Sequence, residues 1–267
     1  MTRPALPAAF LTTPIAHRAL HDSQAGIPEN SLAAIAAAIT AGYGIEIDVQ
    51  LSADDEAMVF HDRDLDRMTA QKGAVRARAV SELERIDLAG SADPIPRLAR
   101  ALELVDGRTP VLIEIKDQSI EGGPGFGPLE RAVAGALEGY PGPAAVMSFA
   151  PGSMAEMARA APRLARGLVT CRFDECHTPG LGAQDRRALR EIRAFDRVEA
   201  SFISHDAADL DRPRVRELRE AGWPVLCWTV RSADMEIKAR QGADNITFEG
   251  YRPPLTAGID APPQATQ

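Results

Sequence analysis

The chain has 267 residues, of which 45% are hydrophobic and 25% are charged, and its formal net charge is −8. This length allows one barrel-sized domain or two smaller ones, and the composition is ordinary for a soluble globular protein with a core of normal size. Because the balance is acidic and Lys and Arg are spread thinly, binding to the phosphate backbone of nucleic acid is disfavoured as a main activity. An anionic substrate would therefore need a local group of cations or a metal ion.

Cysteine usage and the start of the chain bear on the compartment. Cys171, Cys176 and Cys227 are too few and too irregularly spaced for a disulfide framework or a thiolate zinc site, which favours a reducing compartment. The first residues hold an apolar stretch broken by prolines, too short for a secretion signal, and no run approaches the roughly 18 apolar residues of a membrane helix. We therefore predict a cytoplasmic protein without stable membrane insertion, whose short amphipathic start could touch a membrane weakly. The oligomeric state is left open.

Eight short β-rich runs alternate with helical stretches along the chain. The runs are residues 14–18, 44–49, 110–116, 144–149, 166–170, 200–205, 224–230 and 244–248. Two of the helical stretches carry boundary signals: Asn30 as N-cap and Gly42 as stop in the first, and Pro213 and Gly222 near the two ends of a later one. A strand and a helix repeated eight times in a chain of this size predict a (β/α)8 barrel, the TIM-barrel fold.

A ninth strand-like run, residues 57–62, departs from this alternation. It follows the second strand after the short polar turn "SADDE", whereas a parallel neighbour would need a crossover of about a dozen residues. The two runs must therefore be antiparallel. The second barrel strand continues past the rim and folds back as a hairpin, which carries His61 to the carboxyl-terminal mouth of the barrel, where barrel enzymes perform their chemistry.

The remaining segments complete a single predicted domain over residues 1–251. Residues 63–109 are longer than one helix requires, so we predict an excursion after the second strand with its own short helix. The Gly/Pro-rich stretch 121–128 directly follows the third strand and is predicted to be a mobile lip of the site. The tail, residues 252–267, is predicted to be disordered.

Charged residues interrupt the second and third predicted strands. Side chains alternate along a strand, so Glu46 and Asp48 point the same way, as do Glu114 and Lys116, and both pairs can converge on the mouth. Carboxylates buried close together are costly unless a cation is bound. The three carboxylates form a hard, oxygen-rich site, which predicts one divalent cation, Mg²⁺ or Ca²⁺. The alternative is that Glu46 and Asp48 pair with arginines at the rim.

Two histidines reach the same mouth. His17 and Arg18 end the first predicted strand, and His61 arrives on the hairpin. Two histidines can act as general base and general acid in hydrolysis near neutral pH, while Arg18 and Lys116 can hold a phosphate. A lone histidine is more often structural, but few purely structural arrangements need this whole set of side chains.

Several other polar residues carry a less specific signal. His21 and Asp22 resemble a second catalytic pair, but an exposed loop explains them better. His177 stands beside Cys176 without further partners for a soft-metal site. His205 ends the sixth predicted strand, where it either lines the pocket or is structural.

Trp228 ends the seventh predicted strand. A Trp at such a position is ordinarily a core residue. Alternation along the strand aims it with the residues of the mouth, however, where it could cover a glycerol or choline group.

These residues and their order resemble the glycerophosphodiester phosphodiesterases of the cytosolic bacterial type over residues 14–250. The resemblance rests on "IAHR", "PENSLAAI", "IEIDVQLS", "MVFHDRDLDRMT", "LIEIK", "VMSF" and "LCWTV". The joint pattern of HR, EN, E-x-D and HD is highly specific. It implies a (β/α)8 barrel that uses one divalent cation to hydrolyse glycerophosphodiesters to glycerol 3-phosphate and an alcohol.

The resemblance also implies roles for individual residues. Carried over by position, they are the metal ligands Glu46, Asp48 and Glu114, the acid/base pair His17 and His61, and the phosphate-binding Arg18 and Lys116. With the phosphoryl group polarised by the metal, one histidine takes the proton of a glycerol hydroxyl while the other protonates the leaving alcohol, and water then opens the cyclic phosphate with the roles reversed. Glu29 and Asn30 match the EN motif, although a helix cap would also explain Asn30.

The departures from the family pattern concern the substrate more than the chemistry. Ala19 stands where the family usually has Gly, and the loop that follows carries extra residues, including His21 and Asp22. The last strand usually ends in a motif close to "GIITD", whereas this chain has "NITFEG", with Glu249 nearest in character. The preferred alcohol is therefore left open, while the core set is intact.

Two rival functions remain. A lysophospholipase D, or a phospholipase D-like enzyme that releases cyclic phosphate, would use the same chemistry. It would want an apolar channel or a membrane-facing loop, whereas the predicted lip offers only Phe126. A non-catalytic phosphoester-binding barrel should have lost His17, His61 or a carboxylate, and none is lost.

Overall fold

The computed structural model describes residues 3–119, 125–174 and 181–255. Most of the predicted tail, half of the predicted lip, and the pair Cys176 and His177 lie outside these described residues. The barrel strands and the predicted site residues lie within them.

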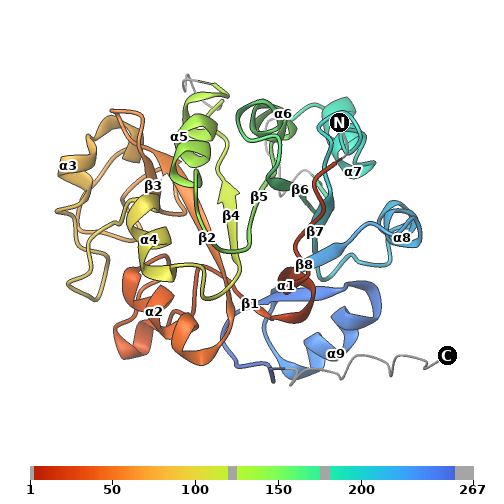
Figure 1. Ribbon diagram of the computed structural model, residues 1–267, viewed down its shortest axis with the longest axis horizontal. Helices are drawn as coiled ribbons and strands as arrows, with labels where there is room; N and C mark the ends of the chain where they lie inside the picture. The colour runs from red at the N-terminus through yellow and green to blue at the C-terminus, as the bar shows by residue number, and fades with distance from the viewer. Residues whose placement is uncertain (1–2, 120–124, 175–180, 256–267) are drawn as a thin grey trace.

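The strands that build the barrel are β1 (Ile15–Ala16), β2 (Gly44–Leu51), β4 (Val111–Ile115), β5 (Ala144–Ser148), β6 (Ala165–Thr170), β7 (Phe202–Asp206), β8 (Val225–Val230) and β9 (Asn245–Phe248). Within the described residues these eight strands are parallel, pair in this order, and close where β9 pairs with β1 (Figure 1). Each overlaps one of the predicted runs. The predicted (β/α)8 fold is therefore confirmed.

Helices follow the strands and cover the outside of the barrel (Figure 1). They are α2 (Leu32–Ala41), α4 (Leu98–Val105), α5 (Pro128–Ala136), α6 (Pro151–Ala160), α7 (Ala183–Arg190), α8 (Pro213–Glu220) and α9 (Ala233–Gly242). Shorter pieces are α1 (Ala9–Thr12), α3 (Val80–Leu83) and the 3₁₀ turns η1 (Ser23–Ala25) and η2 (Val75–Ala77). Each connection returns the chain to the amino end of the next strand, so the strands deliver their last residues to one shared mouth.

The start of α2 corrects one prediction. Ser31, and not Asn30, is the N-cap, since the Ser31 side chain accepts a hydrogen bond from the N–H of Ala34. Asn30 has a φ of 58° and turns its side chain away from the helix. The helix ends as predicted at Gly42, whose φ of 77° is the left-handed conformation that glycine adopts without strain.

Apolar side chains pack in two layers, one inside the barrel and one between the strands and the helices. Inside, Leu112, Phe202 and Leu226 fill the space between the strands, and Phe10 of α1 packs beneath them. A Cβ at Gly167 would lie 2.3 Å from the ring of Phe202, so the absence of a side chain there makes room for the ring. The barrel is thus a packed core that supports the mouth rigidly.

The hairpin is also confirmed. Strand β3 (Ala57–Val59) runs antiparallel to the end of β2, with Val49 opposite Val59. The excursion that follows has a small core of its own, formed by Met58, Phe60, Leu65, Val75, Val80, Leu83, Leu88 and Ile95. Figure 1 shows this excursion at the side of the barrel, with α3 at its outer edge. One wall of the mouth therefore rests on a separate hydrophobic cluster.

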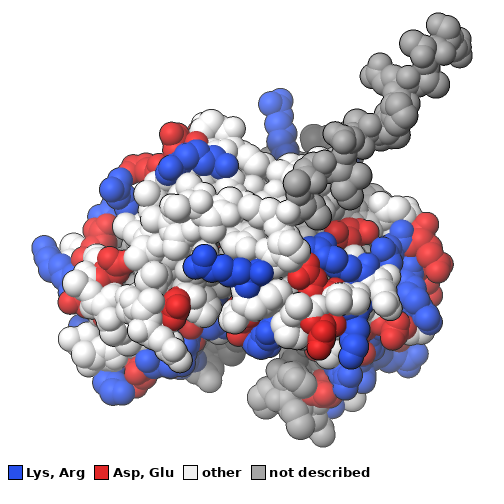
Figure 2. Space-filling model, turned by 90° about the horizontal axis from the view of Figure 1, so that it is seen from below, with Lys and Arg blue, Asp and Glu red and all other residues white. Residues whose placement is uncertain are grey.

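The surface carries charges of both signs. On the face drawn in Figure 2, Lys and Arg lie among Asp and Glu. No helix in the described ranges is both long and apolar enough to cross a bilayer. The cytoplasmic location and the absence of nucleic-acid binding stay predictions.

Candidate active site

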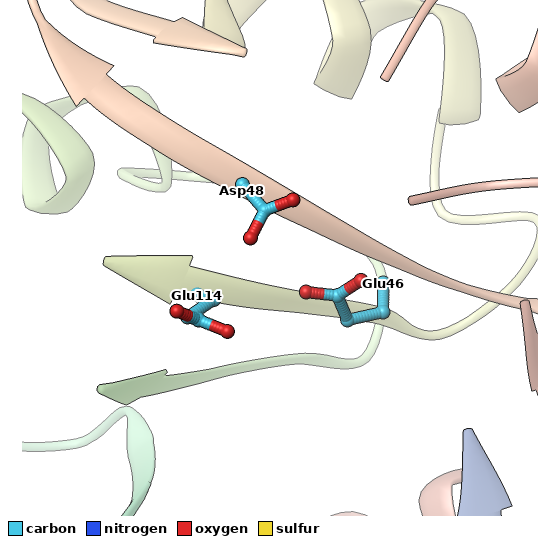
Figure 3. Close-up of side chains that lie close together, drawn as sticks. All are labelled: Glu46, Asp48 and Glu114. Atoms are coloured by element: carbon cyan, nitrogen blue, oxygen red, sulfur yellow. The ribbon is translucent and has the colours of Figure 1, made fainter. Parts of the chain in front are cut away.

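Three carboxylates from the neighbouring strands β2 and β4 meet (Figure 3). Glu46 and Asp48 are two residues apart on β2, and Glu114 of β4 lies opposite Asp48 in the strand register. One oxygen from each side chain lies within 4.8 Å of the others, and all three residues are buried. The structure therefore brings together the three residues that the sequence predicts as metal ligands.

Lys116 lies next to these carboxylates. Its Nζ is 2.7 Å from Asp48 Oδ1 and 2.5 Å from Glu114 Oε1. Although burial opposes it, the charges of Asp48 and Glu114 hold the pKa of Lys116 above its usual range. Burial likewise opposes the ionisation of Asp48, but the positive charge of Lys116 keeps the pKa of Asp48 well below its usual value. Lys116 is therefore a permanent cation beside an ionised Asp48.

Glu46 has an unsatisfied oxygen. Its Oε2 accepts the backbone N–H of Arg18 at 2.8 Å, whereas its Oε1 is buried and has no hydrogen-bond partner in the described part of the chain. Burial, and then the charges of Asp48 and Glu114, raise the pKa of Glu46 well above its usual value. A divalent cation would provide a partner for this oxygen and offset the repulsion among the carboxylates. Mg²⁺ and Ca²⁺ prefer oxygen ligands of this kind, so the three residues fit such an ion.

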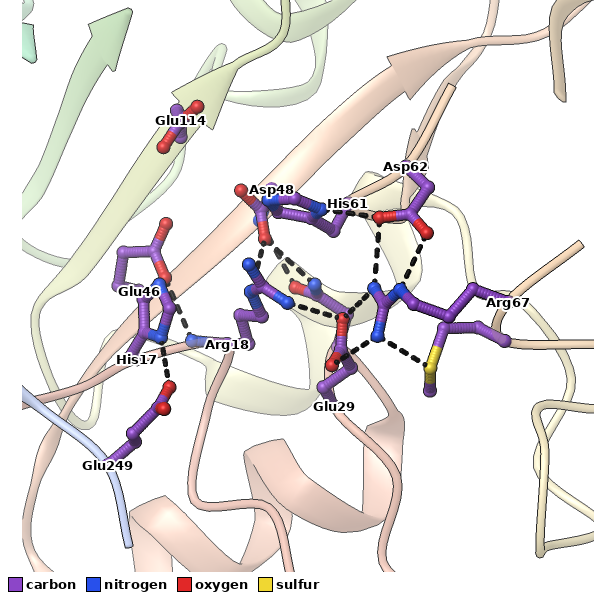
Figure 4. Close-up of polar contacts among 12 residues, drawn as sticks. His17, Arg18, Glu29, Glu46, Asp48, His61, Asp62, Arg67, Glu114 and Glu249 are labelled. Carbon is purple, nitrogen blue, oxygen red and sulfur yellow. Dashed lines mark hydrogen bonds and ion pairs between the residues drawn. The ribbon is translucent and has the colours of Figure 1, made fainter. Parts of the chain in front are cut away.

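His17 is held at the edge of the cluster by the end of the last strand. Its Nδ1 lies 2.6 Å from Oε2 of Glu249 (Figure 4). Arg231 donates a hydrogen bond of 2.7 Å to the other oxygen of Glu249. The hydrogen bond from His17, against the effect of burial, lowers the pKa of Glu249 to about 2. The ionised carboxylate fixes the ring and leaves Nε2 on the side of Glu46.

His61 is held in the same manner from the hairpin. Its Nδ1 lies 2.6 Å from Oδ1 of Asp62, and Arg67 donates to both Asp62 oxygens, at 2.6 and 2.9 Å. Burial raises the pKa of Asp62, but the hydrogen bonds from Arg67 and His61 outweigh it and bring the value to about 2. Burial and the positive charge of Lys116 lower the pKa of His61 below its ordinary value, which favours the neutral imidazole.

Arg18 lies between the carboxylate cluster and the hairpin. Its Nη1 donates to Glu29 Oε1 at 2.8 Å, and its Nε lies 3.7 Å from Asp48 Oδ2. The alternative that the strand carboxylates pair with arginines therefore holds for Asp48, which lies near the Arg18 side chain, but not for Glu46, which accepts only the backbone N–H of Arg18. Arg18 and Ala19 have φ values of 53° and 64°, so the chain makes a left-handed turn directly after His17.

Asn30 lies in the site and contacts Asp48. The interpretation of Asn30 as a helix cap did not predict this contact. Its Nδ2 donates to Asp48 Oδ2 at 2.9 Å, and its Oδ1 accepts the backbone N–H of Asp48 at 3.1 Å. Glu29 and Asn30 thus position two different groups, since Glu29 binds Arg18 while Asn30 orients Asp48. The signal in the sequence was the adjacency of these two residues, which a cap alone does not require.

An aromatic wall forms the other side of the mouth. The rings of Phe149 and Trp228 meet edge to face at 5.5 Å, and Phe149 meets Phe173 in the same way at 6.3 Å. The indole N–H of Trp228 donates to the carbonyl of Ser204 at 3.0 Å, which fixes the ring. The mouth therefore has a charged side on β1, β2, β4 and β9 and an aromatic side on β5, β6 and β8.

His21 is half-buried, and the interpretation of it as an exposed loop residue is wrong. Its Nε2 is buried and has no hydrogen-bond partner among the residues that the structure describes. Burial lowers the pKa of His21, although the charge of Glu249 opposes this. Asp22 does not pair with it but caps η1, accepting the N–H groups of Gln24 and Ala25.

His205 is structural. It is fully buried, its Nδ1 lies 2.7 Å from the Thr170 hydroxyl, and its Nε2 lies 3.2 Å from the carbonyl oxygen of Asp209. It shares a face of β7 with Ile203, which packs in the layer between strands and helices. His205 therefore points away from the mouth.

Comparisons with known proteins agree with this geometry. The model of the "Glycerophosphoryl diester phosphodiesterase family" matches residues 17–249. A glycerophosphodiester phosphodiesterase of Caldanaerobacter subterraneus subsp. tengcongensis is 32% identical over 247 residues, which cover 88% of this chain and 93% of that protein. The match begins at His17 and ends at Glu249, so it spans both ends of the site.

Solved structures give the same result. A phosphodiesterase of Oleispira antarctica, solved in complex with the product sn-glycerol-3-phosphate, is 25% identical and superposes with a TM-score of 0.71 over 90% of this chain and 94% of that one. A putative glycerophosphoryl diester phosphodiesterase of Silicibacter pomeroyi, 22% identical, has a TM-score of 0.73 over 90% of this chain and 93% of that one, which supports the fold alone.

Proposed function

The chain belongs to the glycerophosphoryl diester phosphodiesterase family and is a phosphoric diester hydrolase, and we propose that it hydrolyses glycerophosphodiesters to glycerol 3-phosphate and an alcohol. The substrate class is supported by the Oleispira antarctica relative, which was solved with sn-glycerol-3-phosphate as its product. The observation that carries the proposed mechanism is the pair of histidine–carboxylate contacts that flank one cluster of buried carboxylates.

Glu46, Asp48 and Glu114 are the proposed ligands of one divalent cation, Mg²⁺ or Ca²⁺. The buried Oε1 of Glu46, which lacks a partner among the described residues, supports this assignment, as does the all-oxygen donor set. Bound there, the cation supplies positive charge that polarises the phosphoryl group. Asn30 serves the same site by keeping the carboxylate of Asp48 in one orientation.

His17 and His61 are the proposed acid/base pair. Each has its Nδ1 on a carboxylate, so its Nε2 is the nitrogen that can exchange a proton with the substrate. The neutral histidine takes the proton of a glycerol hydroxyl as that oxygen attacks phosphorus, and the protonated one gives its proton to the departing alcohol. Water then opens the cyclic phosphate with the two roles reversed, which returns both histidines to their starting states.

Arg18 and Lys116 are proposed to hold the phosphate. Both cations reach the mouth beside Asp48, so a phosphate bound there would meet positive charge from two sides. Trp228 is proposed to cover the organic part of the substrate, because its ring is fixed on the aromatic side of the mouth.

The test is phosphorus NMR of the enzyme supplied with Mg²⁺ or Ca²⁺, a mixture of glycerophosphodiesters and one lysophospholipid, repeated with a chelator. We expect glycerol 3-phosphate to accumulate only without the chelator, and the shrinking substrate signal identifies the alcohol that is released. A signal from lysophosphatidate, or from a cyclic phosphate that persists, would move the assignment to a phospholipase D-like enzyme. An absence of turnover with every divalent cation would contradict the proposed function and favour a binding protein.

A further inference from the structure

Arg67 lies on the excursion rather than on a barrel strand, yet it contacts both Asp62, directly after the hairpin, and Glu29, in the loop between β1 and α2. Its Nε and Nη2 donate to the two oxygens of Asp62, at 2.6 and 2.9 Å. Its Nη1 and Nη2 donate to the two oxygens of Glu29, at 3.0 and 2.7 Å. The planar guanidinium thus meets two carboxylates along two of its edges (Figure 4).

These contacts complete a chain of hydrogen bonds between two groups of the proposed mechanism. At one end, Asp62 holds Nδ1 of His61 at 2.6 Å. At the other end, Glu29 holds Nη1 of Arg18 at 2.8 Å. Arg67 is the link between these ends, so the acid/base histidine and the phosphate-binding arginine are oriented by one and the same side chain.

The energetics favour a positioning role over a contribution to stability. An ion pair at a surface is worth about 0–1 kcal/mol, and 45% of the Arg67 side chain is exposed. A bidentate fork, however, fixes direction as well as distance. Asp62 and Glu29 share the Nη2 of Arg67, so without the guanidinium these two negative groups would repel each other. As they moved apart, Asp62 would displace His61 and Glu29 would displace Arg18.

We propose that Arg67 is a positioning residue that sets His61 and Arg18 relative to each other through Asp62 and Glu29. The inference rests on the proposed function, because it is expressed in the rate of that reaction. Arg67 does not itself touch the reacting atoms. Its removal lets the His61 ring and the Arg18 guanidinium move independently.

A matched control exists in the same excursion. Arg97 makes a comparable fork with Glu84, at 2.8 and 2.9 Å, and this pair contacts neither histidine. In the same part of the fold, R67M therefore breaks the two forks of Arg67, and R97M breaks the single fork of Arg97. Their melting temperatures should fall by similar amounts, whereas kcat should separate them.

The experiment measures kcat, KM and melting temperature for the wild type, R67M, R67K and R97M on the glycerophosphodiester that the wild type turns over. We expect R67M to lower kcat by about 10- to 100-fold, the usual effect of losing a group that orients an active-site residue. R97M should keep the wild-type kcat. R67K should stay close to R67M, because an ammonium carries the charge but cannot make the fork.

Double variants identify the route of the effect. R67M should add little to D62N, since both break the same chain, but it should multiply with E249Q, which acts on the other histidine. A kcat of R67M equal to that of R97M, a full rescue by R67K, or independent effects of R67M and D62N would each overturn the inference. A wild type inactive on every glycerophosphodiester would instead overturn the proposed function.

Discussion

His17 and His61 face the same carboxylates, but different parts of the chain hold them. His17 directly follows β1, and its partner Glu249 directly follows β9, the strand that pairs with β1. His61 and its partner Asp62 lie on the hairpin, outside the barrel strands, and Arg67 holds Asp62 from the excursion. One histidine is thus positioned by the backbone of a closed sheet and the other by a network of charged side chains.

The difference matters because the two kinds of support respond differently to mutation. The backbone N–H of His17 donates to the carbonyl of Phe248 at 2.9 Å, so the strand ladder itself sets where His17 begins. No substitution of a side chain removes that bond. The hairpin and the excursion share a small core of their own, and the position of His61 there depends on contacts between side chains. We therefore expect the barrel side to tolerate the loss of a supporting side chain better than the hairpin side.

The first test replaces the histidines themselves. H17Q and H61Q should each lower kcat by about 10²- to 10⁴-fold, the usual contribution of a general acid or base. A substrate that releases p-nitrophenol, which leaves without a proton, should restore much of the rate to the variant that lost the general acid. It should restore little to the other. Near-normal activity in either variant, or recovery of both, would contradict the division of roles.

The second test removes what the two sides share. E46Q should lower kcat by about 10²- to 10³-fold, the loss expected when one preorganised electrostatic group is removed. The affinity for Mg²⁺ or Ca²⁺, measured by calorimetry, should fall with it. Because burial and neighbouring carboxylates raise the pKa of Glu46, the variant should melt no lower than the wild type in the presence of a chelator. Unchanged metal affinity would rule out Glu46 as a ligand.

The third test compares the carboxylates that hold the histidines. E249Q and D62N should each reduce kcat by about 10- to 100-fold, as for other groups that orient an active-site residue. D62N should lie at the upper end, because Asp62 also holds Arg67 and through it Glu29. E249Q should lie at the lower end, since the strand still places His17. A larger loss for E249Q than for D62N would reverse the comparison.

The sequence predicted the parts of this arrangement that follow from strand periodicity. Alternation along β2 and β4 placed Glu46, Asp48 and Glu114 on one face, and the short turn after β2 required the hairpin that brings in His61. The same rule could have decided His205. The strand extends to Asp206, and His205 shares the outward face of Ile203, so alternation assigns it to the outer layer.

The partners of the histidines could not be predicted in the same way. His17 and Glu249 are 232 residues apart and meet because the barrel closes, which no local pattern reports. Arg67 lies in an irregular segment without a helical or strand period. The sequence therefore could not predict which way its side chain points. Asn30 was misread because a helix does begin beside it, although its cap is Ser31. These contacts, which the sequence did not predict, all join segments that are far apart in the chain or lack regular structure.

The pH dependence of stability gives a fourth test, on the barrel side. The pKa of Glu249 is about 2 in the folded protein against an ordinary 4.5, so its ion pairs stabilise the fold above pH 4.5 and lose that effect as the pH falls toward 2. E249Q lacks this titration. The wild type should therefore melt higher than E249Q at pH 7, and the gap should narrow between pH 4.5 and pH 2. A gap that does not change with pH would show that Glu249 does not stabilise the fold through its charge.

The smallest effect is expected from the outermost residue of the barrel side. Arg231 makes a single contact of 2.7 Å with Glu249, and 60% of its side chain is exposed, so it should contribute about 0–1 kcal/mol to stability. Without Arg231, Glu249 keeps its bond to His17. R231M should therefore change kcat by less than about threefold, which corresponds to about 0.7 kcal/mol in the activation free energy. R67M, the corresponding change on the hairpin side, should lower kcat by a factor at least three times larger. Equal effects of R231M and R67M on kcat would mean that both histidines depend alike on their arginines, and that the closed sheet gives His17 no additional support.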